Sequence, residues 1–170
     1  EIAWFLAAFV LGGAFSQIPT GWLADKYDRR WVLIWVSAAA TASCAVTVGF
    51  SGGGASGVFW AAGLFGFMTM PIYSLSAAHA HDFADGSERV ELSAALLFFY
   101  ALGAIAAPLV SSWLIEGYGP DALFGFIATS HVGLLIFGLT RMRVRPTAKE
   151  RTNYVYAPRT SFLLGRLIGR

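Results

Sequence analysis

The sequence predicts an all-α, polytopic membrane protein with five transmembrane helices. The chain is 56% hydrophobic and only 13% charged, with a mean hydropathy of +0.61, which is far from the composition of a soluble domain. Five stretches lack Asp, Glu, Lys and Arg, and each approaches the roughly 20 helical residues that cross a bilayer core. Runs of this length favour helices over a β-barrel. The stretches are residues 2–20, 31–50, 57–78, 92–115 and 122–140. Tryptophans lie at their ends, as in an interfacial aromatic belt: Trp4, Trp22, Trp31, Trp60 and Trp113.

The stretches follow one another through short connections. A charged loop, 21–30, separates the first two, and a glycine-rich turn leads to the third, which contains Pro71. The fourth contains Pro108 and the fifth His131. Proline removes a backbone hydrogen bond and kinks a helix, and helix breaks in transporters often mark moving or substrate-lining segments. A kink retained only for packing is the alternative.

The basic residues predict the orientation of these helices. The twelve Lys and Arg residues fall in the loop 21–30, in the loop 79–91 and from Arg141 onward, whereas the two other gaps contain none. Because Lys and Arg concentrate in cytoplasmic loops, both basic loops and the C-terminus are expected to be cytoplasmic. A complete protein with five spans and an N-terminus outside the cytoplasm would be unusual, so we expect this chain to be a fragment of a longer protein.

The charged loop carries a recognisable pattern. It reads Gly21-x-x-x-Asp25-Lys26-x-Asp28-Arg29-Arg30 and resembles the signature loop of the major facilitator superfamily, Gly-x-x-x-Asp-(Arg/Lys)-x-Gly-(Arg/Lys)-(Arg/Lys). The departure is Asp28, where the family usually has glycine; Asp tolerates left-handed backbone, so a tight turn can survive. Residues 70–82 and 89–108 also resemble a bacterial YcaD-like branch of that family.

The resemblance implies that this loop latches one state of an alternating-access carrier. Gly21 is expected to let neighbouring helices approach. Asp25 is expected to accept backbone N–H groups at a helix N-terminus and to favour its positive dipole end. Arg29 and Arg30 can then bind Asp25, loop carbonyls or lipid phosphates. The alternative is that the loop provides only positive-inside anchoring.

The signature loop recurs in each six-helix half of that family. A basic tail follows the last stretch without a further span, which favours the C-terminal half of a twelve-helix carrier. Residues 1–145 are then the transmembrane five-helix region, and residues 146–170 are a cytoplasmic basic tail. Its end, 162–170, can form a short interfacial helix or be disordered. The implied location is the bacterial inner membrane, beside an N-terminal half of the same polypeptide.

The resulting functional prediction is secondary active transport of a small molecule. A non-transporting membrane sensor or assembly subunit on the same scaffold is the alternative. An enzyme is disfavoured because no nucleophile–base pair, phosphate loop or convincing metal set is visible, and no cofactor is expected. Nucleic acid is not an expected partner, because the basic residues are accounted for by topology and the tail.

Polar groups at membrane depth are the candidate cavity lining. These are Thr69, Tyr73, Ser74 and Tyr100, whose hydroxyls can orient a ligand on an apolar wall; ordinary helix packing is the alternative. No Lys or Arg lies at midplane depth in these helices, which favours a neutral or amphiphilic substrate.

Three titratable residues are the proton-coupling candidates, because ionisable groups within spans are functional hypotheses by default. Only His131 lies cleanly within a span, near the middle of the last stretch, and a neutral histidine bonded to a neighbouring helix is the alternative. His79 and Asp82 lie three residues apart on one helical face, where a solvated helix end is the alternative. A metal site that adds His81 is disfavoured, because three ligands at this spacing do not converge on one point.

Overall fold

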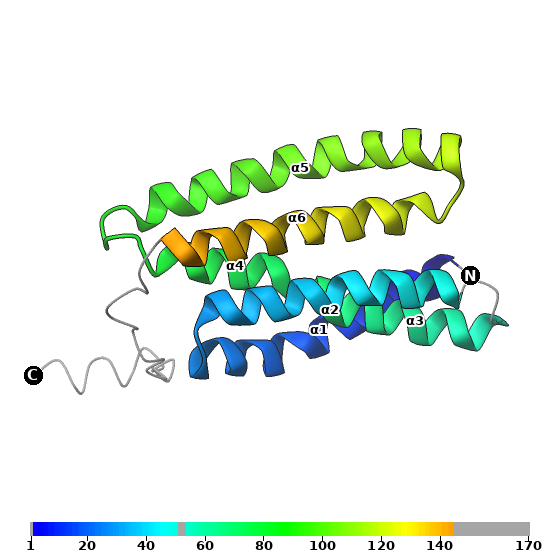
Figure 1. The fold of residues 1–170 in the computed structure, drawn as a ribbon, viewed down its shortest axis with the longest axis horizontal. Helices are drawn as coiled ribbons and strands as arrows, with labels where there is room; N and C mark the ends of the chain where they lie inside the picture. The colour runs from blue at the N-terminus through cyan, green and yellow to red at the C-terminus, as the bar shows by residue number, and fades with distance from the viewer. Residues whose placement is uncertain (1, 51–53, 145–170) are drawn as a thin grey trace, which may run out of the picture.

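The computed structural model describes residues 2–50 and 54–144, and every secondary-structure element in these residues is a helix (Figure 1). The order is α1 (Ile2–Lys26), α2 (Arg29–Gly49), α3 (Gly54–Thr69), α4 (Pro71–His81), α5 (Arg89–Tyr118) and α6 (Ala122–Val144). Helices α3 and α4 follow each other as one candidate span, Ser56–His81, so five segments are long and apolar enough to cross a membrane. The predicted fold class and five spans are confirmed. The tail 146–170 lies outside the described residues.

The first helix extends beyond the apolar stretch that predicted it. Helix α1 continues through Gly21 and Asp25 to Lys26, and α2 begins at Arg29. The expected loop 21–30 is therefore only a tight turn between two helices. Loss of hydrophobicity marks where a helix leaves the bilayer core, but it does not end the backbone hydrogen bonding, because the residues that follow are compatible with a helix.

The two prolines expected to kink helices behave differently. Helix α3 ends at Thr69 and α4 begins at Pro71, so the helix is interrupted at Met70. Pro71 occupies the first turn of α4, where its missing N–H removes no bond within that helix. Helix α5, in contrast, continues through Pro108 as one element of 30 residues.

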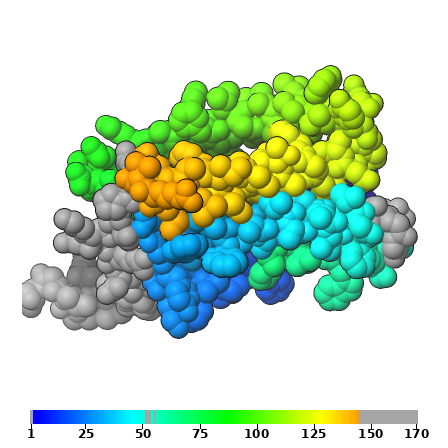
Figure 2. Space-filling model, in the orientation of Figure 1, coloured from blue at the N-terminus to red at the C-terminus, as the bar shows by residue number. Residues whose placement is uncertain are grey.

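The helices form an elongated bundle with two visible parts (Figure 1). Helices α5 and α6 run side by side, while α1, α2 and α3 form the other part. On the face shown in Figure 2, α6 lies between α5 and α2, and α6 packs along α2. Helix α5 contains no buried residue, so its small side chains contact little in the described chain.

The tightest helix contact joins α1 to α3 through glycines. A Cβ on Gly12 would collide with the backbone carbonyl of Gly63, and a Cβ on Gly66 would collide with the carbonyl of Phe9. Small residues let transmembrane backbones approach closely. Beside them, Met70 at the break between α3 and α4 packs against Gly13. The position of α1 is thereby coupled to the start of α4.

Candidate functional site

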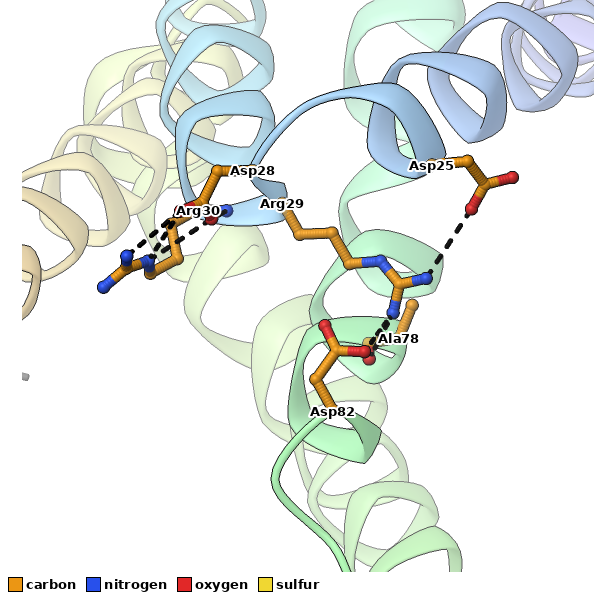
Figure 3. A network of polar contacts seen from close by, with 6 residues as sticks. All are labelled: Asp25, Asp28, Arg29, Arg30, Ala78 and Asp82. Atoms are coloured by element: carbon orange, nitrogen blue, oxygen red, sulfur yellow. Dashed lines mark hydrogen bonds and ion pairs between the residues drawn. The ribbon is translucent and has the colours of Figure 1, made fainter. Parts of the chain in front are cut away.

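Arg29, the first residue of α2, connects three helix ends (Figure 3). Its Nη1 lies 2.6 Å from Oδ1 of Asp82, at the C-terminal end of α4, and donates to the Ala78 carbonyl at 3.0 Å. Its Nη2 lies 3.6 Å from Oδ1 of Asp25, near the end of α1. One guanidinium thus links the ends of α1 and α4 to the start of α2.

The two carboxylates bound by Arg29 differ in environment. The side chains of Arg29 and Asp82 are only 22% and 16% exposed, whereas that of Asp25 is 49% exposed. Water screens an exposed pair, and charge-assisted hydrogen bonds are strongest when they are short and shielded. Asp82 is therefore the stronger partner.

An apolar cluster supports this charged junction. Ala24 of α1, Val32 and Val36 of α2 and Leu75 of α4 are buried against one another. The polar contacts and this cluster involve the same three helices. The junction is a packed contact between helix ends, and the charged residues are not merely solvated loop residues.

Asp28 and Arg30 form a second, separate pair. Asp28 is the N-cap of α2, with φ −62° and ψ 119°, and its carboxylate accepts the Arg30 backbone N–H at 3.0 Å. Arg30 Nη2 also lies 3.0 Å from Oδ2 of Asp28. The expectation of left-handed backbone at Asp28 is wrong: the position is extended, as N-caps are, so glycine is not required. Figure 3 shows Arg29 and Arg30 pointing in opposite directions.

Two other loop expectations, for Gly21 and Asp25, are corrected by the structure. A Cβ on Gly21 would meet no described atom within 4 Å, so this glycine does not mediate a close approach there. Asp25 lies near a helix C-terminus, where the dipole disfavours an anion. The capping role that was expected of Asp25 belongs to Asp28. Lys26 points its Nζ over the rings of Trp22, at 4.8 Å, and Tyr27, at 5.8 Å.

Three of the four polar candidates at membrane depth connect α4 to α1 or to α5. Ser74 donates to Gln17 Oε1 at 2.9 Å, which connects α4 to α1. The rings of Tyr73 and Tyr100 pack at 5.1 Å between α4 and α5. Thr69 donates instead to the Phe65 carbonyl of its own helix. Gln17 with Ser74 and Tyr73 with Tyr100 are two exposed pairs that adjoin at consecutive residues of α4, and we call these four residues the polar wall.

The three histidines have different neighbours and do not form one site. His79 packs edge-on against Phe83, with ring centroids 5.2 Å apart, while its expected partner Asp82 is bound to Arg29. His81 lies 3.3 Å from the hydroxyl of Ser93 on α5. His131 is partly buried in α6. Their roles in proton coupling stay predictions.

Two features escaped the sequence argument. The contact between Arg29 and Asp82 spans 53 positions, and no local pattern pairs them. Gln17, in contrast, has a signal in the sequence: it is the one amide in the stretch 2–20, and an amide within a span is a candidate for hydrogen bonding between helices.

Comparison with known proteins gives a consistent result. The family model described as Major Facilitator Superfamily matches residues 1–168. An uncharacterised MFS-type transporter of Yersinia pestis (strain Pestoides F) is 31% identical over 129 residues, covering 75% of this chain and 32% of that protein. The uncharacterised MFS-type transporter YcaD of Salmonella paratyphi B is 29% identical over 130 residues, covering 76% and 32%. The chain spans about a third of the length of these relatives. No solved structure matches it.

Proposed function

Because the chain belongs to the major facilitator superfamily, a family of multi-pass membrane transporters and not of enzymes, we propose that it forms most of the C-terminal half of a secondary transporter. The complete protein would move a small molecule by alternating access. Of the two halves we propose the C-terminal one, with the basic segment 141–170 as its cytoplasmic tail. The charged junction and the tail would then face the cytoplasm, with residues 146–170 as a basic tail that anchors to the membrane surface.

The observation that carries this proposal is the three-way contact of Arg29. Alternating access requires helix ends to separate on one side of the membrane and to close on the other. Arg29 holds Asp25 and Asp82 from two further helices, so these ends separate only when its bonds break. The junction therefore acts as a latch for the state in which this side is closed.

The polar wall is the proposed surface for substrate. Gln17 and Ser74 supply an amide and a hydroxyl, and Tyr73 and Tyr100 supply aromatic faces with polar tips. No Lys or Arg of the described chain lies at this depth in α1, α4 or α5, and an anionic substrate would need a cation from the other half. We therefore favour a neutral or amphiphilic substrate.

The upstream reading frame is the first test. About seven further spans with a second copy of the loop motif would support the carrier and its C-terminal half, whereas a soluble sensor or catalytic domain there would refute both.

The second test uses the full-length protein in liposomes. We expect flux of a neutral amphiphilic dye across the vesicle membrane, abolished by Arg29→Gln and retained by Lys26→Gln, which removes a charge from the same loop but no carboxylate contact. Repetition with an imposed pH gradient separates proton-coupled transport from facilitated diffusion. Equal loss of flux in both variants would contradict the latch.

A further inference from the structure

A cavity of about 220 Å³ lies on the other side of the charged turn from the latch. Helices α2, α4 and α6 enclose it. Its polar lining comes from the side chains of Arg30, Ser37, Ser76, His79 and Arg141. Its apolar lining comes from Leu33, Ile34, Leu134, Phe137 and Met142. The lining is therefore mostly apolar, and Arg30 and Arg141, near the ends of α2 and α6, lie at its mouth.

Ser37 indicates that a polar ligand enters this cavity. The residue is 1% exposed, and its hydroxyl has no hydrogen-bond partner in the described chain. The backbone carbonyl of the same residue is already engaged by Thr41. An unpaired buried hydroxyl costs about 1–3 kcal/mol. A ligand oxygen in the cavity would remove that cost.

The charges around the cavity define the ligand's charge. Arg30 is paired with Asp28 at 3.0 Å, and Arg29 is paired with Asp82 on the other side of the turn. The Arg30–Asp28 pair is formally neutral, whereas Arg29 faces Asp25 as well as Asp82, so that cluster carries one net negative charge. Arg141, in the last turn of α6, adds one positive charge at the mouth. The site therefore fits a monoanion better than a dianion.

The apolar wall indicates what is attached to that anion. Phe137 is 62% exposed, so the wall of the cavity continues onto the outer surface of α6. Gly138 adds no side chain there, and a Cβ on it would lie 3.4 Å from Ile34. A hydrocarbon chain can thus leave the cavity along α6 without crossing a polar barrier.

We propose that this cavity binds one anionic phospholipid. The phosphodiester, a monoanion, lies at the mouth beside Arg141 and Arg30, and an ester carbonyl oxygen of the lipid, deeper in the cavity, accepts from Ser37 and Ser76. One acyl chain follows the apolar wall past Phe137. Basic pockets between transmembrane helices are suited to such headgroups. The site is distinct from both the latch and the polar wall.

The test uses the full-length protein, delipidated and titrated with phosphatidylglycerol or phosphatidylcholine in native mass spectrometry. We expect one tightly retained phosphatidylglycerol. Arg141→Gln should weaken it at least about tenfold, since it removes a charge-assisted bond. Arg143→Gln is the matched control, because Arg143 lies in the same turn but outside the cavity lining, and it should change affinity less than about twofold.

A second variant tests lipid binding independently if Arg141→Gln fails to fold. Ser37→Ala removes only the buried hydroxyl and should weaken phosphatidylglycerol about fivefold, with no loss of thermal stability. Equal effects of the two arginine variants, or equal retention of phosphatidylcholine, would overturn the proposal in favour of general surface charge. Displacement by inorganic phosphate would instead indicate a soluble anion. Binding that requires deletion of residues 146–170 would show that the tail, not lipid, occupies the cavity.

Discussion

The latch predicts that two similar carboxylates contribute very unequally. Asp82→Asn and Asp25→Asn each remove one negative charge facing Arg29 while preserving side-chain shape. The contact to Asp82 is 2.6 Å long and mostly shielded, whereas that to Asp25 is 3.6 Å long and half exposed. A shielded charged hydrogen bond contributes about 1.5–3 kcal/mol, and an exposed pair about 0.2–1 kcal/mol. Double-mutant cycles with Arg29→Gln should return coupling energies in these two ranges.

Hydrogen–deuterium exchange of the full-length protein in nanodiscs measures these energies without a known substrate. Because 1.4 kcal/mol corresponds to a factor of ten, Asp82→Asn should raise the opening of amides near Ala78 roughly ten- to hundredfold. Asp25→Asn should raise it less than about fivefold, and Lys26→Gln should leave it unchanged.

Two results would refute this reasoning. Equal exchange in the Asp25 and Asp82 variants would mean that distance and burial do not determine the strength of the latch. An Asp82→Asn effect that persists in full when Arg29 is already Gln would mean that Asp82 acts through another group. The charge exchange Arg29→Asp with Asp82→Arg should restore part of the protection, which a loss of local packing would not allow.

Three further predictions concern packing, capping and the polar wall. Gly66→Ala should lower the melting temperature of the full-length protein, at a cost of about 1–3 kcal/mol, because its methyl would meet a carbonyl of α1. The control is Gly133→Ala, where a Cβ has open space, and it should leave the melting temperature unchanged. Equal shifts in the two variants would contradict the close contact. Asp28→Ala should cost about 1 kcal/mol of stability, while Asp28→Asn keeps the cap and most of that stability; thermal unfolding compares the two. Gln17→Leu and Ser74→Ala should each reduce flux in liposomes at unchanged melting temperature, and normal flux in both would remove the polar wall from the transport path.

Hydropathy predicted the number and order of the helices because each span must satisfy its own backbone in hydrocarbon. It placed the end of α1 six residues early, at Thr20 instead of Lys26, since apolarity reports depth in the membrane and not hydrogen bonding. The motif located the charged turn, but it assigned the capping role to Asp25 instead of Asp28.

The partners of the charged residues could not be predicted in the same way. Arg29 reaches Asp82 only because α2 packs against α4, and that packing depends on side chains far apart in the sequence. The unpaired hydroxyl of Ser37 is likewise a property of three packed helices. The sequence shows a serine among other small residues and does not distinguish it from them.

The interruption before Pro71 bears on where water can enter the bundle. Proline has no N–H, so the carbonyl of Phe67, four residues earlier, lacks its usual helical donor. Hydrocarbon offers no replacement, whereas a water molecule does. Tyr73 and Ser74 follow within one turn of α4, so the free backbone carbonyl and these two polar side chains can bind water at a similar depth. In the transporter proposed above, a solute passing the polar wall would shed its hydration shell gradually, onto a hydrated strip of protein and not directly onto hydrocarbon.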